Sequence, residues 1–190
     1  MIKSQLRKAY LERRAALSAQ EVQEASRGIA ELFFDEVPLA GVRSVHTFIR
    51  IPKFNEIDTS LIYHRIWREY PSIQMSAPRL SGSDGIESVN FDLAAETAES
   101  DWGIHEPAGD ILTPPEDIDV VIVPLLCFDL RGYRVGYGKG YYDRFLAKCR
   151  SDCLKVGVSC FPPVPSIEDV DRYDVKLDLC IMPEKCLRFG

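Results

Sequence analysis

A run of apolar residues in the second half of the chain constrains the fold more than any other feature. Residues Ile118 to Pro124 are near-continuously apolar. A strand with one face in solvent alternates apolar and polar residues, whereas a strand covered on both faces reads as a continuous apolar run. The longest apolar run, Val120 to Phe128, is far shorter than the ~20 residues that cross a bilayer. We therefore predict a central strand of a sheet covered by helices on both faces, and no membrane span.

The remaining pattern alternates helices with strands. The predicted helices cover residues 3–17, a second segment that begins at the capping box Ser18-x-x-Glu21 and stops before Pro38, a third capped by Thr59, and residues 140–150. The other predicted strands are 44–49, 73–77, 86–91, 154–160 and 177–183, and residues 101–115 are predicted to form a proline-bearing loop. This order indicates an α/β fold with a mostly parallel or mixed sheet in a single domain, residues 1–190.

Charge limits the partners that the surface attracts. The net charge is -6 and the pI is about 5.2, so the surface on average repels nucleic acids and acidic membranes. Basic residues gather near the start of the chain, at Lys3, Arg7, Lys8, Arg13 and Arg14. A polyanionic ligand must therefore meet a concentrated site, and the first helix supplies cations for one.

The cysteines and the first residues indicate the compartment. The six cysteines include no C-x-x-C pair and mostly lie in apolar segments, which is typical of reduced core thiols. Residues 1–17 mix charged and apolar side chains at helical spacing, unlike a signal peptide. We expect a cytoplasmic protein.

Three glycines at alternate positions follow the apolar strand and form the most informative motif. Gly136, Gly138 and Gly140 allow positive φ angles and a close backbone approach, so successive N–H groups can point at one anion. Arg134 and Lys139 add positive charge to this glycine loop. Asp143 follows in the first turn of the next helix, where a carboxylate can hold a divalent cation beside phosphates.

The spacing matches neither common nucleotide fingerprint. In a Walker A loop, four residues separate the first glycine from Gly-Lys, and Ser or Thr follows the lysine. Here Gly140 follows Lys139. In the dinucleotide fingerprint the third glycine comes three residues after the second, and here it comes two after. A glycine-rich turn without a ligand stays open as an alternative.

Other polar residues are ambiguous from their spacing alone. Lys3 and Arg7 share one helix face and either grip phosphate oxygens or form a solvated basic face. Glu56 could accept two N–H donors from a heterocycle, and Trp102 either stacks on a planar ligand or fills the core. The acids Asp171, Asp174 and Asp178 either contact a metal or are solvated. No zinc-ligand spacing and no nucleophile signature is visible.

The segment from Val123 to Arg144, with Gly-Tyr-Gly-Lys-Gly-Tyr-Tyr-Asp at 136–143, resembles the signature of the 5-formyltetrahydrofolate cyclo-ligase family. Weaker correspondences follow the family's order. They are Lys3-x-x-x-Arg7, Asn55 to Thr59, Trp102 to Pro107, and Val164-Pro followed by Asp174 to Asp178. Together they span nearly the whole chain. One departure lies in Cys160 to Pro165, which lacks a glutamine common in the family.

The resemblance implies an enzyme that uses ATP and Mg²⁺ to close 5-formyltetrahydrofolate to 5,10-methenyltetrahydrofolate, releasing ADP and phosphate. It implies a three-layer α/β/α fold like that of the ribose-phosphate isomerase and CoA-transferase group. We expect no nucleic-acid or membrane partner, and a monomer or weak homodimer.

The resemblance also implies roles for individual residues. Positions implied to bind ATP are Lys3, Arg7, Arg134, Gly136, Tyr137, Gly138, Lys139, Gly140, Tyr141, Tyr142 and Asp143. Positions implied to bind the folate are Glu56, Trp102 and Tyr141, and those implied to hold Mg²⁺ are Asp143 and Asp174. Lys139, Tyr141 and Arg134 are implied to be catalytic.

Two alternatives remain at this stage. A sugar-phosphate isomerase or CoA transferase of the same fold would not need ATP. A non-catalytic relative could bind a nucleotide or RNA through the basic helix and the loop. The net charge of -6 disfavours RNA binding.

Overall fold

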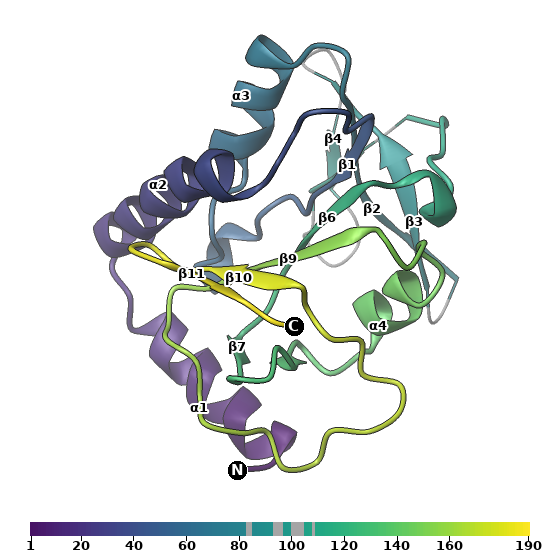
Figure 1. Ribbon diagram of the computed structural model, residues 1–190. Helices are drawn as coiled ribbons and strands as arrows, with labels where there is room; N and C mark the ends of the chain where they lie inside the picture. The colour runs from purple at the N-terminus through teal and green to yellow at the C-terminus, as the bar shows by residue number, and fades with distance from the viewer. Residues whose placement is uncertain (83–84, 93–96, 100–104, 108) are drawn as a thin grey trace.

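A seven-stranded mixed sheet forms the centre of the molecule (Figure 1), in the order β11-β10-β9-β6-β1-β2-β3. The computed structural model describes all residues except 83–84, 93–96, 100–104 and 108. The five inner strands run parallel, while β3 and β11 pair antiparallel at the two edges. The predicted α/β class with a mixed sheet is therefore confirmed.

The element bounds are as follows. The strands of the sheet are β1 (Ser44–His46), β2 (Gln74–Ser81), β3 (Gly85–Asn90), β6 (Val120–Val123), β9 (Leu154–Val158), β10 (Leu179–Ile181) and β11 (Cys186–Arg188). The helices are α1 (Lys3–Ala15), α2 (Ala19–Glu36), α3 (Ser60–Glu69) and α4 (Tyr141–Leu146), with 3-10 turns η1 (Pro52–Phe54) and η2 (Pro115–Asp117). Two separate hairpins pair β4 (Thr97–Glu99) with β5 (His105–Pro107), and β7 (Cys127–Phe128) with β8 (Arg134–Val135).

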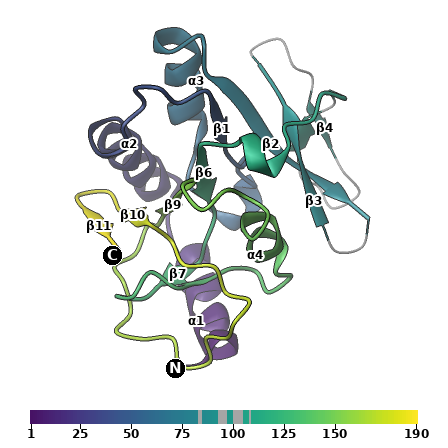
Figure 2. The ribbon, with the colours of Figure 1, turned by 45° about the vertical axis from the view of Figure 1, so that its right-hand side comes forward.

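Strand β6 is buried on both faces, as its apolar run predicts. Val120 and Ile122 belong to the hydrophobic core that α2 and α3 cover. Val121 and Val123 belong to a second core that α4 covers. Figure 2 shows α2 and α3 on one side of the sheet and α4 on the other. The alternation of side chains along one strand thus fills two cores at once.

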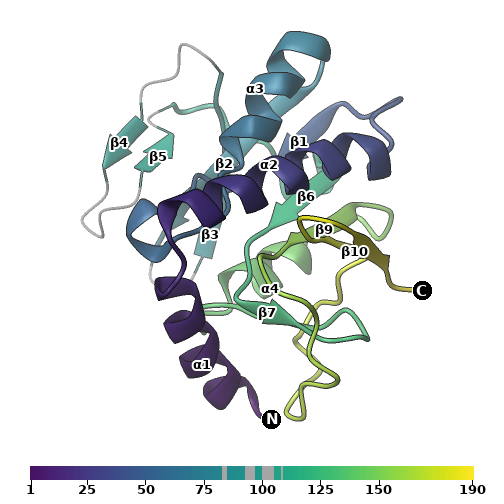
Figure 3. The same ribbon diagram turned by 90° about the vertical axis from the view of Figure 1, so that its left-hand side faces the viewer.

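Helix α1 does not cover the sheet but lies beyond the end of α2 and beside the β7–β8 hairpin (Figure 3). Its buried residues are Leu6, Tyr10 and Arg14, which are four positions apart and so share one face. Arg13 is exposed, and its guanidinium lies over the rings of Tyr10 and Phe161. Arg14 is the arginine that enters the interior.

Several predicted boundaries differ from the structure. Strand β2 continues through Pro78. At this position β2 pairs with β3 but no longer with β1, so the N–H group that proline lacks is not needed for a hydrogen bond to β1. The stretch 101–115 is not all loop, since it holds β5 and begins η2. Strand β1 ends at His46 and α4 ends at Leu146, earlier than predicted, and β4 and β11 were not predicted.

The two predicted helix caps have different outcomes. Ser18 and Glu21 form the predicted capping box, with Glu21 N donating to Ser18 Oγ at 3.2 Å and Ser18 N donating to Glu21 Oε2 at 2.8 Å. Thr59 precedes α3, but its side chain makes no cap because its hydroxyl donates to the carbonyl of Phe48. Asp58 Oδ1 accepts from Ser60 N at 3.1 Å instead.

All six cysteines are free thiols, and Cys127, Cys153 and Cys180 are buried, as predicted. Within the described residues, no helix has the length and apolar character that a membrane span requires.

Gly28 marks the closest approach of α2 to the loop that follows β10. A Cβ at position 28 would lie 2.4 Å from the carbonyl oxygen of Pro183. In an exposed helix Gly→Ala stabilises by about 1 kcal/mol, whereas overpacking against backbone costs about 1–3 kcal/mol. We expect Gly28→Ala to lower the free energy of unfolding, measured by urea denaturation. The exposed neighbour variant Arg27→Ala should leave it nearly unchanged, and a stabilised Gly28→Ala would contradict this packing.

Candidate functional site

The candidate site lies beyond the carboxyl ends of β1, β6 and β9, where ligands bind in sheets of this kind. The segments that leave these three strands supply Phe48, Leu125 and Phe161 to one cavity. The β7–β8 hairpin follows β6 and leads into the glycine loop, residues 136–140, and α4 begins directly after it. Helix α1 closes the site from outside the sheet.

The backbone of the glycine loop requires glycine at two positions. Gly138 has φ +95° and Gly140 has φ +67°, in the left-handed region that other residues rarely adopt. A Cβ at Gly138 would also lie 2.9 Å from Cζ of Arg7, so the missing side chain lets that guanidinium lie against the loop. Arg7 Nε donates to the carbonyl of Gly136 at 2.9 Å. The predicted proximity of the cationic first helix and the loop is confirmed.

Lys3 lies on the same face of α1 and pairs with Asp174. Its Nζ donates to the two carboxylate oxygens at 2.7 Å and 2.5 Å, and its side chain is 19% exposed. Burial alone would lower the pKa of Lys3, but Asp174, with smaller contributions from Asp171 and Asp169, raises it overall. Lys3 is therefore a partly buried paired cation and not part of a solvated face.

Arg134 and Asp143 form a second ion pair at the base of the loop. Arg134 is buried and donates from Nη2 to Asp143 Oδ1 at 2.8 Å and from Nη1 to the carbonyl of Val175. Burial lowers the pKa of Arg134, while the charge of Asp143 opposes that shift. Asp143 Oδ1 also accepts from Val175 N at 3.1 Å. Through Asp174 and Val175, this late segment therefore contacts both cations, Lys3 and Arg134.

Asp129, which was not predicted to have a role, holds the hairpin to that late segment. Its buried carboxylate accepts from the backbone N–H groups of Tyr133 at 3.1 Å and Ile167 at 3.0 Å, and from the Arg131 guanidinium at 2.7 Å. The carboxylate thus connects the β7–β8 hairpin to residues 164–174.

Asp143 and Asp174 offer a limited set of donors to a metal ion. Each carboxylate is paired with a cation, and no group of three His, Cys, Asp or Glu residues in the described part of the chain could hold a metal. Mg²⁺ commonly binds through one or two carboxylates together with substrate phosphates and waters. The donors therefore fit a Mg²⁺ ion that arrives with phosphates.

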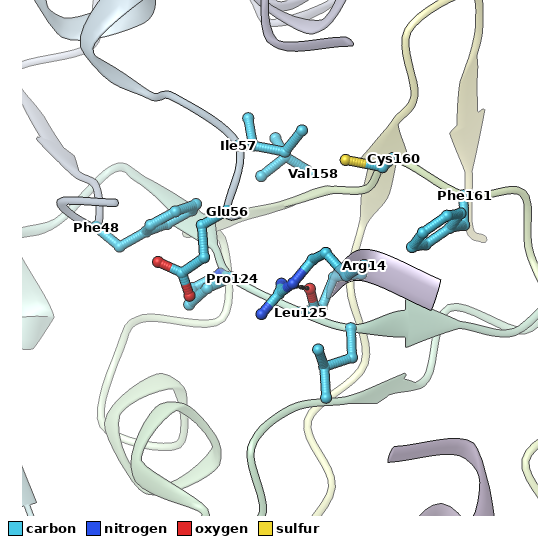
Figure 4. Close-up of a pocket in the computed structure, with 10 residues that line it drawn as sticks. Arg14, Phe48, Glu56, Ile57, Pro124, Leu125, Val158, Cys160 and Phe161 are labelled. Atoms are coloured by element: carbon cyan, nitrogen blue, oxygen red, sulfur yellow. Dashed lines mark hydrogen bonds between the residues drawn. The ribbon is translucent and has the colours of Figure 1, made fainter. Parts of the chain in front are cut away.

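Glu56 lies in a small cavity with Arg14 on the opposite side (Figure 4). Its Oε2 accepts from Ile51 N at 2.7 Å, and its Oε1 accepts from the hydroxyl of Tyr137 at 2.5 Å. The cavity volume is about 10 Å³, which is room for about one water molecule. Burial raises the pKa of Glu56, and the hydrogen bonds from Tyr137 and Ile51 and the charge of Arg14 act against this.

Arg14 is the site residue that sequence reasoning missed. It is 6% exposed and donates to the Leu125 carbonyl at 3.3 Å and to the hydroxyl of Tyr137. The spacing of Leu6, Tyr10 and Arg14 could have identified it, because a buried arginine on an apolar helix face requires a partner inside.

The other predicted site residues are spread over neighbouring positions. Tyr141 lines a separate cavity of about 380 Å³ between α4 and Ile86 of β3. Tyr142 packs its ring near His46 and Phe145, and its buried hydroxyl has no hydrogen-bond partner among the described residues. Lys139 is exposed at the loop tip. Trp102 lies outside the described residues.

Comparison with known proteins gives a consistent result. A family model described as the 5-formyltetrahydrofolate cyclo-ligase family matches residues 1–183. A probable 5-formyltetrahydrofolate cyclo-ligase of Schizosaccharomyces pombe is 30% identical over 161 residues, which cover 77% of this chain and 78% of the relative. The 5-formyltetrahydrofolate cyclo-ligase of Escherichia coli K12 is 26% identical over 177 residues, 92% of this chain and 96% of the relative.

Solved structures agree with these relatives. The NMR structure of Aquifex aeolicus 5,10-methenyltetrahydrofolate synthetase superposes with a TM-score of 0.82 at 29% identity, covering 99% of this chain and 93% of that one. The 5,10-methenyltetrahydrofolate synthetase of Mycoplasma pneumoniae gives a TM-score of 0.75 at 25% identity, covering 97% and 100% of the two chains.

The Arg134–Asp143 pair should be a large contributor to stability. Arg134 is buried and Asp143 is partly exposed, so removing the guanidinium leaves a partly buried carboxylate unpaired and costs about 1–3 kcal/mol. We expect Arg134→Met to lower the free energy of unfolding by about that amount in urea titrations. The matched variant Lys139→Met, at the exposed loop tip, should change it by less than about 0.5 kcal/mol. Equal stability of the two variants would show that Arg134 has no such structural role.

Proposed function

The chain belongs to the 5-formyltetrahydrofolate cyclo-ligase family, and we propose from this membership that it converts 5-formyltetrahydrofolate and ATP into 5,10-methenyltetrahydrofolate, ADP and phosphate. One observation carries the proposal beyond the family name. A glycine loop bordered by cations is hydrogen-bonded to a buried carboxylate, since the Tyr137 hydroxyl of the loop donates to Glu56. A phosphate donor and a heterocyclic acceptor can therefore be held side by side.

The glycine loop is the proposed site of the ATP phosphates. Backbone N–H groups from Gly136 to Gly140 supply donors, and Arg7 and Lys139 supply charge. Lys3 can exchange one bond to Asp174 for a phosphate oxygen. Tyr137, Tyr141, Tyr142 and Asp143 complete the proposed nucleotide contacts, while Arg134 supports the loop through Asp143.

Glu56 is the proposed anchor for the folate ring system. A pteridine with adjacent ring N–H and amino groups presents two donors, and an ionised carboxylate can accept both. The cavity beside Glu56 holds about one water, so the ring enters only if Tyr137 moves outward. Tyr141 and Trp102 are proposed to contact the remainder of the folate, and the cavity at Tyr141 has the volume for such a group.

The chemistry requires positioning and charge neutralisation but no protein nucleophile. In the proposed reaction the formyl oxygen attacks the γ-phosphorus and ADP leaves. N10 then attacks the formyl carbon, the carbon–oxygen bond breaks, phosphate leaves and the N10 proton is lost. Donors aimed at the phosphates stabilise the charge that develops during the transfer. Lys139 in the loop and Tyr141 directly after it are the proposed catalytic groups, together with Arg134, which is paired with Asp143.

Mg²⁺ is proposed to accompany ATP. Asp143 and Asp174 are the carboxylates that would hold it, and the ion would neutralise phosphate charge during the transfer. Arg134 and Lys3 orient these carboxylates through hydrogen bonds.

The direct test is formation of the methenyl product, followed by its absorbance after mixing the protein with 5-formyltetrahydrofolate and Mg-ATP. We expect product only when both substrates are present. Asp143→Asn should lower kcat by about 100-fold or more, since a charge in the phosphate-transfer site is lost. Asp152→Asn, whose side chain is 74% exposed, serves as control. Product without ATP, or none with it, would contradict the proposal.

The pKa of Glu56 gives a prediction for the pH dependence of folate binding. Burial raises the pKa of this carboxyl above its usual value, so it takes up a proton at a higher pH than an exposed glutamate does. The folate donors need the ionised form, and the affinity should therefore decrease as pH falls through the raised pKa. The affinity for folate is measured by calorimetry between pH 5 and pH 8, at intervals of about one pH unit. These measurements show whether the affinity decreases as predicted. In Glu56→Gln the same titration should be weak and flat with pH.

A further inference from the structure

Three segments that are distant in sequence meet at a single hydroxyl group. Arg14, near the end of α1, donates to the hydroxyl oxygen of Tyr137 in the glycine loop. That hydroxyl in turn donates to Glu56, which follows η1 in the sequence, at 2.5 Å. Arg14 and Glu56 are 6% and 4% exposed, so two ends of this chain of contacts are buried. Tyr137 is 37% exposed and reaches inward from the surface.

The loop that carries Tyr137 has glycines on both sides of the tyrosine, Gly136 and Gly138. Within the described part of the chain, only the sequence neighbours of Gly136 have atoms within 4 Å of a Cβ placed on it. The Gly136 carbonyl is held by Arg7 at 2.9 Å, so the cation nearest the loop backbone also sits next to Tyr137. A phosphate bound by this backbone and by Arg7 would compete for the contact that fixes the position of the tyrosine.

The cavity beside Glu56 is small, and the Tyr137 hydroxyl contacts its two charged lining residues, Arg14 and Glu56. Its volume of about 10 Å³ leaves no room for a ring, and Oε1 of Glu56 already has a donor in the tyrosine hydroxyl. Arg14 Nε is buried in this cavity without a hydrogen-bond partner among the described residues. The cavity is therefore lined by a cation and an anion, Arg14 and Glu56, which can form further hydrogen bonds when another group enters.

We propose that Tyr137, held by Arg14, is a positioning residue that masks Glu56 and thereby couples the nucleotide loop to the folate cavity. Nucleotide at the loop draws Tyr137 outward, Glu56 becomes available to the folate donors, and the two substrates strengthen each other's binding. By thermodynamic linkage the factor is the same in both directions. The inference rests on the proposed function, because it takes ATP and folate as the two ligands.

Calorimetry without turnover tests this coupling. The affinity for 5-formyltetrahydrofolate is measured with and without a saturating non-hydrolysable ATP analogue and Mg²⁺. In the wild-type protein we expect the analogue to tighten folate binding by at least about 5-fold, the lower end of ordinary coupling. In Tyr137→Phe the folate should bind tightly even without the analogue, and the factor should fall below about 2-fold.

Two arginine variants separate this role from a general effect on α1. Arg14→Met should lose the coupling as Tyr137→Phe does, because the tyrosine loses its anchor. Arg13→Met should keep the wild-type factor, since the Arg13 guanidinium lies over the rings of Tyr10 and Phe161. If Arg14→Met does not fold, Tyr137→Phe still decides, since it removes one oxygen from a partly exposed side chain.

The outcomes distinguish this inference from the proposed function. A wild-type factor near one, or an undiminished factor in Tyr137→Phe, overturns the inference even when the wild-type protein forms the methenyl product. Lost coupling in both variants supports it. If the wild-type protein does not bind folate at all, the inference and the proposed function fail together.

Discussion

The burial of β6 on both faces determines where this molecule can do chemistry. Val120 to Val123 contribute alternately to the two cores, so the strand has no free face. A ligand can therefore approach the strand only at its end. The chain that leaves β6 must then turn outside the sheet, and there it forms the β7–β8 hairpin and the glycine loop. Helix α1 packs on that hairpin through Leu6 and Tyr10. The site therefore depends on the central strand even though that strand contributes no site residue.

Internal contacts occupy the proposed ligand-binding groups. Lys3 is paired with Asp174, Arg134 with Asp143, and Glu56 accepts from Tyr137. Isolated charges would be costly to bury at these positions, and each pair lowers that cost. Binding of a polyphosphate with its cation is then an exchange of partners, which requires less desolvation than the filling of an empty charged pocket. Arg134 is buried in the same way, with its guanidinium donating to Asp143 and to the carbonyl of Val175.

The sequence predicted well what local chemistry determines. The apolar run at Ile118 to Pro124, the capping box at Ser18 and the positive φ angles within the glycine loop depend on neighbouring residues alone, and the structure has all three. The partners of Arg14, and the link from Asp129 to Ile167, depend on segments more than 30 residues away. No spacing rule contains that information. The lengths of β1 and β2 were also mispredicted. Strand β1 ends before both of its neighbours, whereas β2 continues beyond β1 along its pairing with β3.

The closed cavity beside Glu56 has a chemical consequence under the proposed reaction. A formyl oxygen that carries a phosphoryl group is open to attack by water as well as by N10, and attack by water would return the starting folate with ATP hydrolysed. The cavity is lined mainly by apolar side chains, including Phe48, Leu126 and Phe161, and has room for about one water. A folate ring that displaces Tyr137 would fill that space and remove the competing water. Under the proposed reaction, the same small volume that restricts entry of the substrate would leave little room for water beside the intermediate.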